Sequence, residues 1–430
     1  MAGRERPATQ LREAPRVTHR QPSIVVVHGH DLGRYLGPYG RGADTPAVDR
    51  FAQSAVVFDR AFAPAPQCSP SRASLATGKY PNKSGMMGLA HLDWKLFDPA
   101  DALPAKLRAL GYQTLLVGEQ HEAATGELLG FERCVGTRWP QLARDVAPAF
   151  AEALDELDPE RPFFVSVGFF EAHRPFDHPG YGDADPASVP LPWYLPDTPE
   201  VRADMAAFFG RVRAFDDGVA TVLAALEARG LADSLIVVVT TDHGIAFPRA
   251  KGTLYDSGLE TALLLRWPGV TPGGTRSEAM VVNVDLFVTL LRAAGGTPSA
   301  DVDGVDLLPL LTGAAEHVRD HMYALLHWHD AFVPMRAIRT ETHKLILDFS
   351  GSERLYLPAD VEDSASGRAL RATELPPPSR VALYDLRADP DERSNLANEP
   401  EHADLVSQLR ERLEAWMRAT GDPLVTEELT

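Results

Sequence analysis

The chain has 430 residues, 44% of them hydrophobic and 24% charged, which is typical of a globular enzyme and leaves room for one large α/β domain with an appendage or for two domains. Its formal net charge of -18 argues against nucleic acid or an anionic membrane as a partner, and no apolar run is long enough to span a bilayer. With Cys68 and Cys134 as the two cysteines, a disulfide framework is excluded, although one bridge between them is conceivable.

Residues 1–21 are rich in arginine and proline and lack the apolar core of a secretory signal. We therefore expect a disordered tail on a protein of the cytoplasm. The sequence leaves the oligomeric state open.

The next part of the chain alternates strand and helix patterns. Runs rich in β-branched residues, without polar alternation, predict strands buried on both faces at 23–27, 114–117, 163–170 and 235–240. Apolar residues at helical spacing predict helices at 45–58, 103–111, 148–157 and 200–229. A stretch dense in proline, glycine and aspartate at 176–200 indicates a long surface loop, a candidate rim for a binding pocket. This alternation indicates a mostly parallel sheet with helices on both faces.

The pattern changes after about residue 315. Short strand patterns joined by turns, typical of an antiparallel sheet, occur at 322–326, 335–339, 344–348 and 381–386. A polar, proline-rich loop is expected at 358–380, and an amphipathic helix at 401–420. We therefore predict a catalytic domain at 22–315 and a smaller C-terminal subdomain at 316–430.

Polar residues follow the four predicted parallel strands. The polar residues are His30, Asp31, His121, His173, Asp242 and His243. Each histidine alone would more often be a core or loop residue, but ligands bind beyond the carboxyl ends of such strands, so the shared position predicts one site. Asp31 and Asp242 are the best ligands for a divalent cation, with the imidazoles of His30 and His243 as additions.

The stretch at 67–78, Gln-Cys-Ser-Pro-Ser-Arg-Ala-Ser-Leu-Ala-Thr-Gly, brings together a thiol, hydroxyls and a guanidinium group. Pro70 sits just inside a predicted helix start, which leaves free backbone N–H groups near Cys68. Such a helix end is expected to lower the pKa of the thiol. A structural cysteine before an ordinary helix is the simpler interpretation, but Arg72, one turn further on, favours a functional site.

The pattern Cys-x-Pro-Ser-Arg at 68–72, with Thr-Gly at 77–78, resembles the signature of the type I sulfatases, and the resemblance extends over nearly the whole chain. It implies the alkaline-phosphatase-like α/β sandwich, with a mostly parallel central sheet and a smaller C-terminal antiparallel sheet plus helix. In this family the cysteine is converted after translation to formylglycine. The resemblance therefore implies that a formylglycine-generating enzyme modifies this cysteine. It also implies a metal ion held by His30, Asp31, Cys68, Asp242 and His243.

The resemblance assigns the remaining site residues too. Arg72, Lys251 and His173 match residues that contact the sulfate group of the substrate. His173 or Lys251 is expected to protonate the leaving group, and His121 to assist the release of sulfate.

Two positions depart from the family pattern. His30 stands where the family usually has an aspartate, and Glu119 where it usually has a lysine. Ca²⁺ is the family's usual ion. Fewer carboxylates and more imidazoles make the site less calcium-like and favour Mn²⁺ or Zn²⁺ as alternatives.

The run Gly-Ile-Ala-Phe-Pro at 244–248 is similar to the heparan N-sulfatase (sulfamidase) branch. We therefore expect a hydrolase that acts on a sulfate ester or sulfamate, on a small sulfated substrate such as a sugar. A phosphonate or phosphate ester hydrolase on the same fold is a second hypothesis, which the pair Asp242-His243 suits. A catalytically silent sulfatase-like binding protein is a third, against which the intact motif at Cys68 argues.

Overall fold

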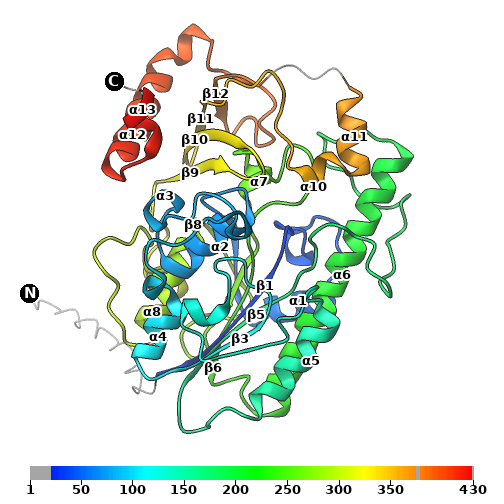
Figure 1. Ribbon diagram of the computed structural model, residues 1–430, viewed down its shortest axis with the longest axis vertical. Coiled ribbons are helices and arrows are strands. Elements are labelled where there is room, and N and C mark those ends of the chain that lie inside the picture. Colours follow the sequence, from blue (N-terminus) through cyan, green and yellow to red (C-terminus); the bar gives the residue numbers. More distant parts are fainter. Residues whose placement is uncertain (1–20, 374–377, 429–430) are drawn as a thin grey trace, which may run out of the picture.

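The structure, a computed structural model, describes residues 21–373 and 378–428. The tail predicted at 1–21 therefore lies outside the described residues, apart from Gln21. The described chain is organised around two sheets, a central one of eight strands and a second one of four strands (Figure 1).

The central sheet has the strand order β4-β3-β5-β1-β6-β7-β2-β8. Its strands are β1 (Ser23–Gly29), β2 (Val56–Phe62), β3 (Gln113–Gly118), β4 (Arg133–Val135), β5 (Phe163–Gly168), β6 (Leu235–Thr241), β7 (Leu263–Arg266) and β8 (Thr275–Val282). Neighbours pair in parallel except at β7, which is antiparallel to β2 and β6. This confirms the predicted mostly parallel sheet.

Helices cover both faces of the central sheet (Figure 1). One face carries α1 (Pro46–Ala52), α5 (Ala143–Leu154) and α6 (Pro199–Ala228), and the other carries α2 (Cys68–Thr77), α4 (Leu103–Ala109) and α8 (Val284–Ala293). In β1, Val25 and Val27 pack toward the first group, whereas Ile24 and Val26 pack toward the second. A strand buried on both faces has no polar alternation, as its sequence indicated.

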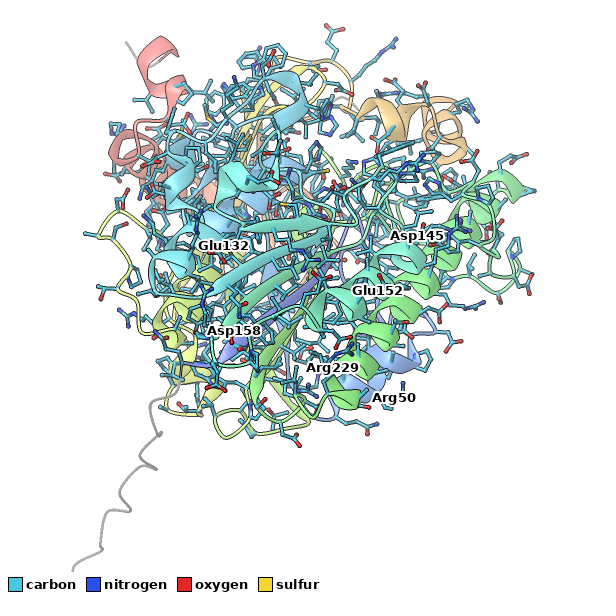
Figure 2. The ribbon with its side chains drawn as sticks, turned by 60° about the horizontal axis from the view of Figure 1, so that its bottom comes forward. Arg50, Glu132, Asp145, Glu152, Asp158 and Arg229 are labelled. Atoms are coloured by element: carbon cyan, nitrogen blue, oxygen red, sulfur yellow. The ribbon has the colours of Figure 1, made fainter. Side chains whose placement is uncertain are left out.

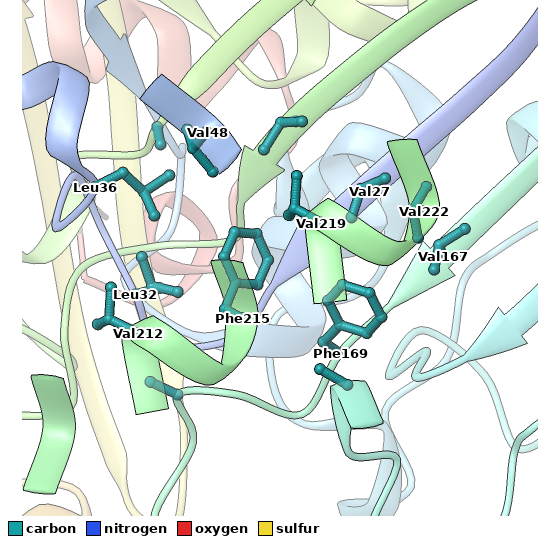
Figure 3. Close-up of a cluster of buried hydrophobic side chains, with 14 of the residues drawn as sticks. Val27, Leu32, Leu36, Val48, Val167, Phe169, Val212, Phe215, Val219 and Val222 are labelled. Atoms are coloured by element: carbon teal, nitrogen blue, oxygen red, sulfur yellow. The ribbon is translucent and has the colours of Figure 1, made fainter. Parts of the chain in front are cut away.

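The longest helix, α6, supplies much of the core on its face. Val212, Phe215 and Val219 follow one another at helical spacing and are fully buried. They meet Val27 of β1 and Phe169, just after β5 (Figure 3). Burial of each such side chain stabilises the fold by about 1.5–3 kcal/mol, and together they fix the strands whose ends carry the candidate site.

The pattern at 45–58, predicted as one helix, is two elements. Helix α1 ends at Ala52 and strand β2 begins at Val56. Val56 and Val57 pair with both β7 and β8, so sheet pairing overrides the helical spacing of the apolar residues.

The second sheet is antiparallel, with the order β12-β11-β10-β9, as the turn-linked strand patterns predicted. Its strands are β9 (His321–Trp328), β10 (Phe332–Thr340), β11 (His343–Asp348) and β12 (Val381–Asp385). Helix α12 (Ala403–Ala419) packs Leu409 and Leu413 against Ile338 and Leu345 of this sheet. The predicted boundary between 315 and 316 falls just before β9 and stays a prediction.

The segment at 358–380 was predicted as a loop, which is wrong for part of it. It contains α10 (Ala359–Glu362) and α11 (Ala365–Arg371). The Ser364 side chain accepts a hydrogen bond from the backbone N–H of Gly367 (3.0 Å), which satisfies a free donor at the start of α11. Helix α11 packs on α6 at the side of the molecule (Figure 1).

The remaining elements are short. They are α3 (Pro81–Ser84), α7 (Asp256–Leu259), α9 (Leu308–Leu311), α13 (Pro423–Glu428) and the 3-10 helices η1 (Gly37–Tyr39), η2 (Ala90–Leu92), η3 (Pro99–Asp101), η4 (Gly126–Leu129) and η5 (Pro400–His402). Asp256 ties α7, which lies between β6 and β7 in the chain, to the second sheet, because it forms ion pairs with Arg339 of β10 (2.8 Å) and Lys344 of β11 (2.5 Å). Within residues 21–373 and 378–428, no helix combines the length and apolar character that a membrane span requires.

Candidate active site

Asp31 lies just beyond β1, next to the end of β6. The two strands are parallel, with Gly29 opposite Thr241, so residues that follow them meet at one edge of the sheet. The backbone N–H of Asp31 donates to Oδ1 of Asp242 (2.9 Å). Asp31 has a φ of 51°, a left-handed conformation that aspartate adopts more readily than most residues. The sequence therefore anticipated correctly that these two strand ends would meet.

The carboxylate of Asp31 is fully buried and is contacted from several sides. Its Oδ1 lies 3.0 Å from Nε2 of His243 and 3.2 Å from Nδ1 of His30. Its Oδ2 lies 2.7 Å from Nζ of Lys251 and 3.7 Å from Nε2 of His173. Burial alone would raise the pKa of Asp31, but Lys251 and His243 hold it well below its usual value. The side chain is therefore ionised and can act as a ligand for a cation.

Asp242 is held by Arg72 and two histidines. Nε of Arg72 donates to Oδ2 of Asp242 (3.1 Å), and Nδ1 of His30 lies 3.3 Å from the same oxygen. Burial opposes ionisation, but His243 and Arg72 keep the pKa of Asp242 below its usual value. The other Arg72 nitrogens contact Nδ1 of His28 (2.7 Å) and a backbone carbonyl of β1 (3.2 Å). All three guanidinium nitrogens are therefore engaged by the protein.

Cys68 begins α2 and points into the same group. Its Sγ lies 3.4 Å from Nε2 of His243, 3.7 Å from Oδ1 of Asp31 and 3.8 Å from Nδ1 of His30. The expected lowering of the thiol pKa by the helix end is wrong, because burial raises the pKa of Cys68 well above its usual value. The unmodified thiol is therefore neutral and a weak nucleophile. It is also free, since no bridge to Cys134 forms.

Lys251 completes the site with a buried positive charge. Its Nζ lies 2.8 Å from Oδ2 of Asp360 and 3.5 Å from Nε2 of His173. Burial lowers the pKa of an amine, but Asp31 and Asp360 raise the pKa of Lys251 well above its usual value. Burial and Lys251 lower the pKa of His173 to about 3. The proton in this pair therefore stays on Lys251, and His173 is neutral.

His121 lies at the margin of the group. Its ring centroid is 6.2 Å from that of His30, and its Nε2 lies 2.9 Å from Nδ1 of His91. Glu119, which directly follows β3, is 8% exposed. Burial raises the pKa of its carboxyl group. The structure thus brings together all nine side chains that were predicted for the site, with His121 outermost.

Three residues of the site were not predicted. His91 lies in η2 and Asp360 in α10, two elements for which the sequence showed no helical or strand pattern. His28, inside β1, orients Arg72 and could have been found as a polar residue in an otherwise apolar strand. For the other two no sequence signal stands out.

The donor atoms around Asp31 fit a divalent metal ion. In each of two overlapping groups, the ligand atoms all lie within 4.8 Å of one another; the groups are His30, Asp31, Cys68 and His173, and Asp31, Cys68, Asp242 and His243. Two ionised carboxylates with several imidazoles suit Mn²⁺ or Zn²⁺, whereas Ca²⁺ prefers a shell of six to eight oxygens.

A cavity of about 430 Å³ is lined in part by Gly252, Thr253 and Leu254, which follow Lys251 in the chain. The predicted loop at 176–200 contributes Trp193 and Tyr194 to its wall, and Tyr255 lines it too. Residues of the second sheet, among them Tyr384, also line the cavity.

The comparisons with known proteins agree with this architecture. A family model described as sulfatase matches residues 22–296, and a model described as N-sulphoglucosamine sulphohydrolase, C-terminal, matches residues 244–363. The N-sulphoglucosamine sulphohydrolase of Homo sapiens is 30% identical, over 94% of this chain and 92% of that protein.

Two solved structures are similar across almost the whole chain. One, a protein in complex with its substrate D-glucosamine-2-N,6-O-disulfate, has a TM-score of 0.76 at 19% identity, over 95% of this chain and 100% of that one. The phosphonate monoester hydrolase of Agrobacterium radiobacter has a TM-score of 0.74 at 20% identity, over 93% of this chain and 96% of that one.

The two sheets and their helices define an α/β protein of the alkaline-phosphatase-like fold. The chain belongs to the sulfatase family, the sulfuric ester hydrolases, as the pattern Cys-x-Pro-Ser-Arg predicted. The C-terminal match confirms the predicted resemblance to the heparan N-sulfatase branch.

Proposed function

We propose that the protein is a metal-dependent sulfatase that removes a sulfate ester or a sulfamate group from a sugar through a formylglycine made from Cys68. The position of Cys68 carries this proposal. Its Sγ lies within 3.8 Å of three ligand atoms, on His30, Asp31 and His243. A group built on that side chain would therefore share a cation with the buried carboxylates.

The metal ion and the formylglycine would have different roles in the reaction. The metal ion would be held by His30, Asp31, Asp242 and His243 together with the modified Cys68. When bound, it supplies Lewis-acid polarisation of a sulfate oxygen. The hydrated formylglycine supplies a hydroxyl nucleophile in place of the neutral thiol. Ca²⁺, the family's usual ion, is the first metal to test, and the donor set favours Mn²⁺ or Zn²⁺.

The chain's own residues then bind the sulfate group and move protons. Lys251 keeps its proton and stabilises negative charge on the sulfate oxygens. His173 is neutral without substrate, and an anionic group beside it would raise its pKa, so binding prepares it to protonate the leaving group. His121, held by His91, would assist the release of sulfate. Arg72 would act by fixing Asp242, since its nitrogens are already engaged.

The sugar substrate is supported by the relatives. The human relative is named for N-sulphoglucosamine, and one similar structure holds a sulfated glucosamine. We propose a small N- or O-sulfated sugar and expect a formylglycine-generating enzyme as the maturation partner. The location in the cytoplasm stays a prediction.

Co-expression with a formylglycine-generating enzyme tests the proposal. We expect intact-peptide mass spectrometry to find the aldehyde at position 68, and the modified protein with metal to hydrolyse an aryl sulfate or a sulfamate. The Cys68→Ala variant is the matched control and should be inactive. If position 68 is fully modified, several metals have been supplied and no sulfate ester or sulfamate turns over, the protein is better explained as a silent sulfatase-like binding protein.

A phosphonate or phosphate ester hydrolase is the second candidate function. The pair Asp242-His243 and the likeness to the phosphonate monoester hydrolase fold favour it. Turnover of a phosphodiester well above that of the sulfate esters and sulfamates, on the same modified sample, would decide for this alternative.

A further inference from the structure

Glu119 is a buried carboxylate without a counter-charge in contact. Its backbone N–H donates to the carbonyl of Gly168 (2.9 Å), which fixes it beyond the end of β3. The residue is 8% exposed, yet within residues 21–373 and 378–428 its carboxylate makes no hydrogen bond or ion pair. Its oxygens are not among the fully buried unpaired atoms, so they are accessible and free to bind a cation.

His121, two residues after Glu119, provides a second possible ligand atom. Its Nδ1 is buried and has no hydrogen-bond partner among the described residues. Its Nε2 contacts Nδ1 of His91 (2.9 Å), and the two rings stack with centroids 5.1 Å apart. A metal-ligating histidine typically uses one nitrogen for the metal and the other for an orienting hydrogen bond, which is the arrangement seen here.

His30 brings the third donor. One ligand atom each from His30, Glu119 and His121 lie within 4.8 Å of one another. Nδ1 of His30 faces Asp31 at 3.2 Å, and the imidazole ring has a second nitrogen on its other side. His30 can therefore contribute to two adjacent sites through different atoms if it releases its ring N–H proton, so that each nitrogen binds one ion.

We propose that His30, Glu119 and His121 hold a second divalent transition-metal ion, beside the ion that we assign to Asp31, Asp242 and His243. Two imidazoles with one carboxylate form a donor set that binds Zn²⁺ and related ions. Both departures from the sulfatase pattern, His30 and Glu119, belong to this one group of three.

The charge of Glu119 favours a cation there. A divalent ion would offset the negative charge of the Glu119 carboxylate, which has no ion-pair partner among the described residues. The existence of the site does not depend on the reaction. Its use, to stabilise negative charge on the sulfate oxygens, rests on the proposed function.

Zinc titration of the full chain tests the site. Metal-free protein with an unmodified thiol at Cys68 is loaded with Zn²⁺ alone, and bound zinc is counted by mass spectrometry and calorimetry. We expect two ions per wild-type chain and one in Glu119→Gln. Glu152→Gln is the matched control, since Glu152 is an exposed residue of α5 (Figure 2) that belongs to neither proposed metal site, and should bind two. One ion per wild-type chain, or two in Glu119→Gln, overturns the proposal.

Crystals of the zinc-loaded wild-type protein give a readout that no folding defect can obscure. We expect two anomalous peaks, one of them about 2.0–2.2 Å from donors of Glu119 and His121. A filled first site without that peak overturns the proposal. Asp242→Asn should lose the first ion and keep the second. None of these measurements uses sulfatase turnover, so failure of the proposed reaction would be recognised separately.

Discussion

Replacing Arg72 by lysine distinguishes a residue that positions a metal ligand from one that contacts sulfate. Lysine keeps the positive charge but lacks the planar guanidinium group. One ammonium group cannot replace the three contacts of Arg72, which reach Asp242 at 3.1 Å, His28 at 2.7 Å and the carbonyl of Gly29 at 3.2 Å. Asp242 would then lose its main orienting donor. Loss of such a donor weakens metal binding about 10- to 100-fold, which corresponds to about 1.4–2.8 kcal/mol.

The assay is calorimetric titration of metal into wild-type and Arg72→Lys protein, both made without the maturation enzyme so that Cys68 is a thiol in each. KM is then measured on modified protein at saturating metal, where we expect the KM of Arg72→Lys to match that of the wild type. Arg108→Lys, at an exposed position of α4, is the control. An unchanged metal Kd combined with a raised KM at saturating metal would refute the reasoning and place Arg72 against the sulfate group.

Three further changes test other parts of the structure. Asp360→Asn removes one of the carboxylates that raise the pKa of Lys251, so the alkaline limb of the kcat/KM profile should move to lower pH; an unmoved limb contradicts this. Asp422→Ala leaves Arg336 buried without its partner, now at 2.6 Å, and should lower the free energy of unfolding in urea by about 3–5 kcal/mol; a loss below about 1 kcal/mol, as for a surface pair, contradicts it. Burial opposes ionisation of Asp256, but Arg339 and Lys344 hold its pKa below the usual range. The stability that results is present above about pH 4 and is lost on acidification. The free energy of unfolding of Asp256→Asn should therefore fall less steeply below about pH 4 than that of the wild type, and equal slopes would refute this.

The strand ends explain why most of the site could be predicted from the sequence. β1 and β6 are uninterrupted apolar runs that lead directly into Asp31 and Asp242. In a parallel sheet, neighbouring carboxyl ends share one edge, so local patterns were sufficient to bring these two residues together. The same reasoning placed His173 after β5.

Other features depended on packing between distant segments. β7 has four residues, too few for a pattern, and it exists because it pairs with β2 and β6. Asp360 reaches Lys251 only through the arrangement of the second sheet and α10. For Cys68, the local effect of a helix end was identified, but burial decides the pKa and acts in the opposite direction.

The ion pair between Lys251 and Asp360 has a consequence for biosynthesis. The two residues are 109 positions apart, and at typical translation rates a ribosome needs on the order of 5–20 s to add that many residues. During this interval Lys251 has been made, while its second acidic partner does not yet exist. The candidate site is therefore complete only when the C-terminal part of the chain has been made and Asp360 has reached Lys251.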